Sequence, residues 1–158
     1  MKKIILLSVC IVFAMASKAQ SNTDEITFMQ SVYGMQKKQL IEEHMKISEA
    51  QKAAFWKLYD EYEVSRKAIG MKRANNIEEY AKKYDVLTNE NAEALVKASF
   101  GVQKDFVKLW EKTYKKMAKE TSPLTATQFI QVEMYLENLV RQSLTDQIPL
   151  IGEFEPKK

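Results

Sequence analysis

The stretch Thr88–Glu120, TNENAEALVKASFGVQKDFVKLWEKTYKKMAKE, decides the fold class of this 158-residue chain. Small or apolar side chains recur in it at steps of three and four: Ala92, Leu95, Ser99, Val102, Phe106, Leu109, Thr113 and Met117. Such steps place side chains on one face of an α-helix. The stretch therefore predicts one long helix with a packed seam.

A second apolar row lies beside that seam and makes the apolar face wider than a surface helix needs. It consists of Val96, Phe100, Val107, Trp110 and Tyr114. A row of lysines that includes Lys104 and Lys108 lies beyond it. Three interpretations stay open: contact with two neighbouring helices, a dimer interface, or an exposed apolar strip edged by positive charge that contacts unfolded polypeptides.

Three further helices are expected. Hydrophobic periodicity predicts one from about Asp24 to Met45, one from Ser48 to about Tyr84, and a last one from Thr125 that ends at Ile148-Pro149. Gly and Pro are scarce, and no valine-rich alternating run between turn residues indicates a strand. The sequence therefore predicts an all-α fold of four helices, two or three of them long.

Two arginines interrupt the apolar stripe of the second helix. Arg66 and Arg73 lie on the same face as Phe55, Leu58, Tyr59, Tyr62, Ile69, Ile77, Tyr80 and Tyr84. Either their stems are buried at a bundle edge while their charged heads reach water, or this segment lines an open surface. The candidate residues for binding other polypeptides are therefore Phe100, Val107, Trp110, Tyr114, Lys104, Lys108, Arg66 and Arg73.

Residues 1–20 are expected to be a cleavable signal peptide. Lys2 and Lys3 precede an apolar run, and small residues follow it, with cleavage expected near residues 16–20. We expect a single helical domain at 21–150 and a short tail at 151–158. Removing the three lysines of the leader leaves the basic and acidic totals equal at 21, so the compositional support for nucleic-acid binding is lost.

Residue types that carry catalysis are scarce. His44 is the sole histidine and the sole cysteine, Cys10, falls in the leader. Nothing supports a histidine acid–base couple, a Ser-His-Asp triad or a cysteine nucleophile. Glu42, Glu43 and His44 are adjacent, so a regular helix cannot turn all of them toward one metal ion. We expect no enzymatic activity, no metal, no cofactor and no small-molecule substrate.

Two short motifs share one pattern: an aliphatic residue, a hydroxyl residue, two spacers and a glutamine. They are Ile47, Ser48 and Gln51, and Leu124, Thr125 and Gln128. A hydroxyl at a helix N-cap and a glutamine three residues on can each satisfy a free backbone N–H, as a capping box. We therefore expect helices to start at Ser48 and Thr125, with Leu124 packed against Phe129. Thr88 to Asn91 repeats the pattern in a weaker form.

The two motifs, the leader and the helical composition resemble the Spy/CpxP family of LTxxQ-motif periplasmic proteins over about residues 47–142. The resemblance implies a periplasmic, cradle-shaped antiparallel homodimer of long helices. It also implies ATP-independent, holdase-type binding of unfolded or misfolded envelope proteins, or alternatively an accessory role with a membrane sensor of envelope stress. The single His44 departs from the metal-sensing relatives, and the neutral mature chain departs from the basic cradle of the chaperones.

Overall fold

The computed structural model describes residues 22–145, 148, 149 and 151. Within these residues it contains the α-helices α1 (Asn22–His44), α2 (Glu49–Lys83), α3 (Asn89–Glu120) and α4 (Pro123–Thr145), with a short 3-10 helix, η1 (Tyr84–Val86), between α2 and α3. No strand occurs in this part of the chain, so the predicted all-α fold of four helices is confirmed. The expected signal peptide and all but Ile151 of the expected tail lie outside the described residues.

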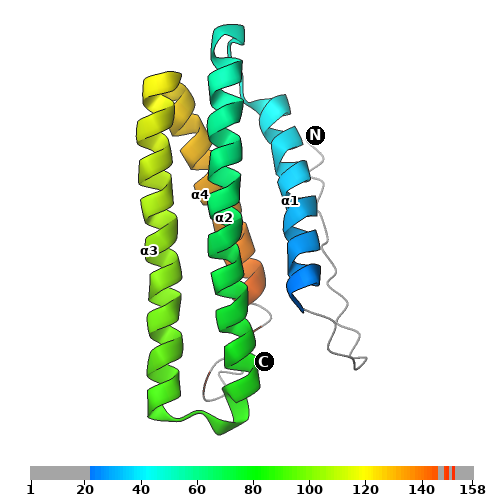
Figure 1. The fold of residues 1–158 in the computed structure, drawn as a ribbon, viewed down its shortest axis with the longest axis vertical. Helices are drawn as coiled ribbons and strands as arrows, with labels where there is room; N and C mark the ends of the chain where they lie inside the picture. Colours follow the sequence, from blue (N-terminus) through cyan, green and yellow to red (C-terminus); the bar gives the residue numbers. More distant parts are fainter. Residues whose placement is uncertain (1–21, 146–147, 150, 152–158) are drawn as a thin grey trace, which may run out of the picture.

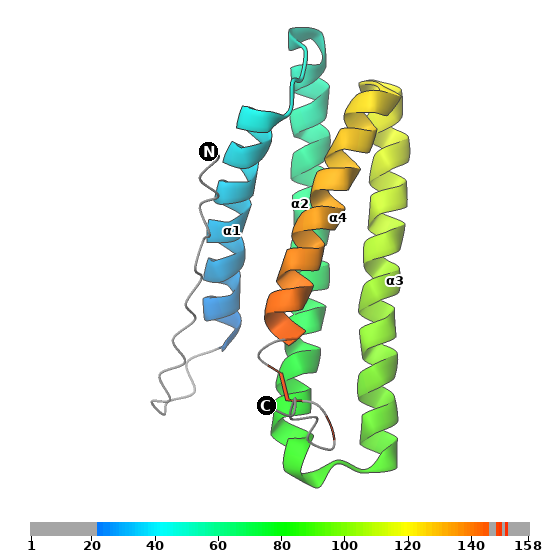
Figure 2. The same cartoon turned by 180° about the vertical axis from the view of Figure 1, so that it is seen from behind.

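α2 and α3 form a long antiparallel hairpin, and the two shorter helices lie against it (Figure 1). α4 runs back from the end of α3 and crosses α2 at a slant, while α1 lies along α2, as Figure 2 shows from behind. α2 continues through Gly70 as a single helix, as the phase of its apolar stripe predicts. No helix in the described part of the chain is both long and apolar enough to cross a bilayer.

An aromatic cluster joins α4 to α2. Phe129 has no exposed surface, and its ring meets those of Phe55, Tyr59 and Tyr62 edge to face at centroid distances of 5.7, 6.1 and 5.2 Å. Each such pair contributes about 0.5–1.5 kcal/mol beyond its buried area. These three contacts therefore fix the position of α4 on the hairpin.

The predicted packed seam of α3 is confirmed over its C-terminal two thirds. Val102, Phe106, Leu109, Thr113 and Met117 are all buried. The seam opens toward the N-terminal end of α3, where its remaining three members, Ala92, Leu95 and Ser99, are half-buried. α4 ends at Thr145 and packs on the other end of α3, so the first turns of α3 have α2 as their described neighbour.

The capping box predicted at Thr125 and Gln128 is wrong. α4 begins at Pro123 because Ser122 is the cap: its Oγ accepts from the backbone N–H of Thr125 at 3.1 Å. Proline suits the first helical position, where its missing N–H would have no intrahelical partner. Gln128 is exposed, and Leu124 is 70% exposed, so Leu124 makes no staple with the buried Phe129.

The capping box predicted at Ser48 and Gln51 is also wrong. Ser48 is the N-cap of α2, but its side chain makes no capping hydrogen bond. Instead, the Thr125 hydroxyl, which is buried, donates to Gln51 Oε1 at 3.3 Å, so the two motifs contact each other. Ile47 is half-buried and packs on the core.

The weaker third copy of the motif is the one that forms a complete capping box. Thr88 Oγ1 accepts from the backbone N–H of Asn91 at 3.3 Å, and Asn91 Oδ1 accepts from the backbone N–H of Thr88 at 2.9 Å. Within the motif at 124–128, Thr125 therefore contacts α2 through Gln51, whereas the pair at 88 and 91 starts a helix.

Candidate functional site

The second apolar row of α3 is largely exposed. Phe100 is 54% exposed, Val107 48%, Val96 45% and Tyr114 38%, whereas Trp110 is half-buried. α3 does contact both α2 and α4, but its apolar contacts with them are made by the packed seam and Trp110. Contact with the other described helices therefore does not account for the remaining four residues, which we call the α3 strip.

Trp110 shows which side of α3 the strip occupies. Its Nε1 donates to the Tyr62 hydroxyl at 3.2 Å, and that hydroxyl donates to Glu133 of α4 at 2.6 Å. Residues three and four apart share a helix face, so Val107 and Tyr114 lie beside Trp110 and farther from the core. The strip therefore lies on the α4 side of α3.

The opposite edge of α3 is tied to α2 by surface ion pairs. Asp105 accepts from Lys72 at 2.7 Å, and Lys116 donates to Glu61 at 3.1 Å. Hydrogen bonding to Lys116 lowers the pKa of Glu61 from its ordinary value. These pairs hold the two long helices in register and leave the strip unobstructed on the other side.

Lys104 and Lys108 lie at the edge of the strip, as expected. Both are exposed, and together with Gln103, Val107 and Glu111 they line a shallow open hollow on α3. At a rise of roughly 1.5 Å per residue, the strip extends over about 27 Å from Val96 to Tyr114. The arrangement is an apolar row with cations on one side.

Arg66 and Arg73 do not belong to this surface. The Arg66 side chain is 12% exposed, and its Nε donates to Glu63 at 2.9 Å. The Arg73 side chain is 16% exposed, pairs with Glu137 of α4 and lies 4.8 Å above the Phe106 ring. Carboxylates inside the bundle engage both charged heads, so the two arginines lie apart from the α3 strip, and their expected part in binding polypeptides stays a prediction.

A cluster of four charged side chains lies between α1, α2 and α4 and was not predicted. The Lys37 side chain, 1% exposed, forms ion pairs with Glu63 and, at 2.8 Å, with Glu133 Oε1. The Glu133 side chain is 3% exposed, and Arg66 pairs with Glu63 from the other side. We call Lys37, Glu63, Arg66 and Glu133 the charge cluster; its formal charges sum to zero.

Burial and pairing shift the pKa values in the charge cluster in opposite directions. Burial raises the pKa of Glu133, although Lys37 and the Tyr62 hydroxyl oppose the shift. Burial also acts to raise the pKa of Glu63, but Arg66 and Lys37 outweigh it and hold that pKa below its usual range. The contact of Lys37 with Glu133 Oε1 is an ion pair whose angle falls outside hydrogen-bond geometry, so Glu133 is the less well compensated carboxylate.

The sequence contains a signal for this cluster. Glu133 follows Phe129 by four residues and Lys37 precedes Ile41 by four, so each charge lies on the apolar face of its helix. A lysine and a glutamate on apolar faces of different helices are candidates for a buried pair, since buried charges require partners.

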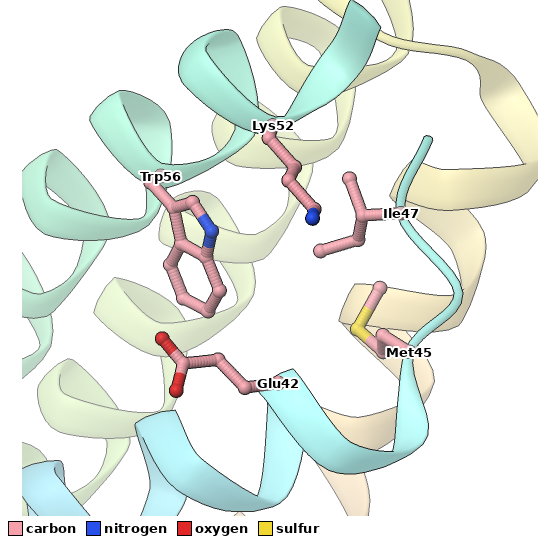
Figure 3. A pocket seen from close by; sticks show the side chains of 5 residues that line it. All are labelled: Glu42, Met45, Ile47, Lys52 and Trp56. Carbon is pink, nitrogen blue, oxygen red and sulfur yellow. The ribbon is translucent and has the colours of Figure 1, made fainter. Parts of the chain in front are cut away.

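A second hollow lies where α1 joins α2, and Figure 3 shows its lining. Glu42, Met45, Ile47, Lys52 and Trp56 enclose about 220 Å³, half open to solvent. Lys38 already covers the Trp56 ring, with its Nζ 5.0 Å from the centroid, so an incoming cation would compete with it. Nowhere in the described residues do three or more His, Cys, Asp or Glu side chains gather as metal ligands.

No protein-family model matches the chain, and neither the curated proteins nor the solved structures include a significant match. The α3 strip and the charge cluster are therefore interpreted from their own geometry.

Proposed function

We propose that the protein is a periplasmic, ATP-independent holdase-type chaperone that binds unfolded or misfolded envelope proteins transiently through the α3 strip. The observation that supports the proposal is the row of four apolar side chains, each 38–54% exposed, on the face of one helix. Single exposed apolar residues are ordinary, whereas several of them along one helix face with a polar edge are typical of an interaction surface.

The dimensions of the strip suit an extended polypeptide. A segment of about eight residues in extended conformation spans about 27 Å, at roughly 3.3 Å per residue. Burial of apolar surface contributes about 25 cal/mol per Å², but the loss of translational and conformational freedom on binding offsets much of this gain. Weak binding with spontaneous release follows, and it requires no nucleotide.

The exposed lysines give the α3 strip a preference for acidic segments of an unfolded chain. Lys104 and Lys108 would attract acidic segments of an unfolded chain, and salt would screen this attraction over a Debye length of about 8 Å at physiological ionic strength. Apolar contact would remain. The resemblance to the Spy/CpxP family supports the periplasmic location and the homodimer as further parts of the proposal.

The proposal is tested by light scattering of a reduced, aggregating model protein, with and without the mature chain at about tenfold excess and without ATP. We expect the wild-type chain to slow aggregation. Phe100→Ser/Val107→Ser should remove most of this effect, because both side chains are exposed and their loss leaves the core intact. Far-UV circular dichroism checks that helicity is unchanged.

The matched control is Met35→Ser/Val64→Ser, which removes two apolar side chains that are 64% and 72% exposed on α1 and α2. This variant should protect as well as the wild type. Unchanged scattering with the wild-type chain, or equal protection by both double variants, would refute the proposal. Capture of one membrane protein in fixed stoichiometry, in place of many denatured proteins, would favour the accessory role in envelope stress sensing.

A further inference from the structure

α1 is attached to the rest of the bundle through few buried side chains. Lys37 and Ile41 are the buried residues among its described side chains, and Met45 follows one residue after its end. α1 packs along α2, and Lys37 pairs with Glu133 of α4. Among its other described side chains, Met35 and Leu40 are 64% and 37% exposed, and Tyr33 is half-buried with its ring 5.0 Å from the Arg66 guanidinium carbon.

The groove beneath α1 is aromatic and has two carboxylates at its base. Lys37 Nζ lies 5.4 Å from the Tyr59 ring centroid and 5.1 Å from that of Tyr62. Glu63 and Glu133 supply the charges that hold the ammonium group. An aromatic wall with carboxylates behind it favours a cation, because ring faces and carboxylates are both negative.

The charges in the groove do not balance without α1. Arg66 neutralises Glu63 with two donors, Nε at 2.9 Å and Nη2 at 3.0 Å. Glu133 then has the Tyr62 hydroxyl, which donates a hydrogen bond but carries no charge. The groove alone thus has one excess negative charge, and its occupant must bring one cation.

The contact of α1 with this groove is specific but weak. A buried ion pair is often no more stabilising than well-packed apolar side chains, whereas it strictly limits which partner and which register are accepted. A helix whose described contacts are mostly those of charged groups, with Ile41 and Met45 as its buried apolar side chains, is expected to open locally, without unfolding of the hairpin.

We propose that the groove between α2 and α4 is a docking site for an amphipathic helix of another polypeptide, and that α1 occupies it as a displaceable internal ligand. The partner helix carries Lys or Arg, followed by aliphatic residues four and eight positions on, as Lys37, Ile41 and Met45 do. This site is separate from the α3 strip and does not depend on the function proposed for that strip.

The first test is amide hydrogen exchange of the wild-type mature chain, read by mass spectrometry. We expect the amides of residues 33–44 to exchange through an opening that is at least about tenfold more populated than the one that exposes residues 55–70 of α2. Equal opening populations for the two segments would show that α1 leaves only when the whole bundle unfolds, and would overturn the proposal.

The second test supplies the helix in trans. Lys37→Glu adds a third carboxylate to the cluster and should release α1. The probe is a fluorescein-labelled peptide with the sequence of residues 30–45, QSVYGMQKKQLIEEHM, titrated into this variant and followed by fluorescence anisotropy. We expect saturable binding. A peptide with Lys37→Glu should bind at least about tenfold more weakly, a difference of about 1.4 kcal/mol.

Two controls keep the second test decisive. A peptide with Lys38→Glu should bind within about threefold of the unmodified peptide, because Lys38 is exposed over Trp56 and outside the charge cluster. Ile41→Ser, which loosens α1 without adding charge, replaces Lys37→Glu if the latter does not fold. No saturable binding, equal binding of the two Lys37 forms, or dimers that exchange α1 in sedimentation would each overturn the proposal.

Discussion

Replacing Lys37 with methionine tests the energetics of the charge cluster. Lys37→Met keeps the length and most of the volume of the side chain but removes the ammonium group. In the wild type that group pairs with Glu63 and with Glu133 at 2.8 Å, and its side chain is 1% exposed. The variant leaves the cluster with two carboxylates and one guanidinium in the interior.

Removing one partner of a buried ion pair costs about 3–5 kcal/mol, because the charge left behind has lost its water and its partner. The free energy of unfolding should fall by this amount while α1 stays docked. The loss is capped by the docking free energy of α1, since release of α1 returns Glu133 to water. If α1 is released, the ellipticity at 222 nm should fall by the share that α1 contributes to the total helix content, and such a fall shows that the loss of stability has reached its upper limit.

A second substitution should reverse most of the loss. Lys37→Met/Glu133→Gln removes one charge of each sign, leaves Arg66 paired with Glu63, and keeps an oxygen that accepts from the Tyr62 hydroxyl. We expect the double variant to be at least about 2 kcal/mol more stable than Lys37→Met in urea unfolding at pH 7. If the two single losses simply add in the double variant, residues 37 and 133 are not coupled and the reasoning fails.

The stability of the same variants should depend on pH in a direction that the raised pKa of Glu133 determines. Burial raises the pKa of Glu133, so the folded state binds a proton more readily than the unfolded state, whose glutamates titrate near about 4.3. Stability linked to Glu133 must therefore rise as the pH falls from 7 toward that value. This rise in the free energy of unfolding should be steeper in Lys37→Met than in the wild type, and it should be absent in Lys37→Met/Glu133→Gln. An equal dependence on pH in all three proteins would contradict the assignment to Glu133.

Three further predictions, two of them with a comparison substitution, test the fold by urea unfolding. Phe129→Ala should cost about 3–5 kcal/mol, since it removes a fully buried ring, whereas Tyr135→Ala, at a 64% exposed position of the same helix, should change stability by less than about 0.5 kcal/mol. Gly101→Ala should stabilise by about 0.5–1 kcal/mol, because nothing lies within 4 Å of the added Cβ; a loss would mean that α3 is not a regular helix there. Thr88→Ala should cost about 1 kcal/mol and Ser48→Ala less than half as much, because only Thr88 makes a side-chain cap; equal costs would contradict the observed hydrogen bonds.

The fold was predictable because helix periodicity is a local property of the chain. The steps of three and four in α3 predict its buried face, and the phase of α2 across Gly70 predicts one helix rather than two. The exposure of Phe100 and Val107 was only one of three interpretations that the sequence left open, because the width of an apolar face does not show how much of it the neighbouring helices cover.

The charge cluster was not predictable in the same way, because it depends on which helices meet. Arg73 read from α2 alone looks like a cation that reaches water, and only α4 supplies Glu137 beside it. Arg66 pairs with Glu63 of its own helix, but the cluster is complete only when α1 brings Lys37 and α4 brings Glu133. The two capping boxes were predicted wrongly for a related reason, although α2 does begin after Ser48 as expected. Thr125 has the chemistry of a cap, but a tertiary contact with Gln51 draws its hydroxyl into the interior, and Ser122 becomes the cap.

The link between α1 and α2 consists of the few residues from Met45 to Ser48. So short a tether keeps a released α1 near its groove at an effective concentration in the millimolar range. A competing helix at micromolar concentration would need about a thousandfold higher intrinsic affinity to displace it from half of the molecules. The tether therefore sets a minimum affinity for any competitor. Basic helices that bind weakly leave α1 in the groove, and only a helix that binds tightly or is locally abundant displaces it.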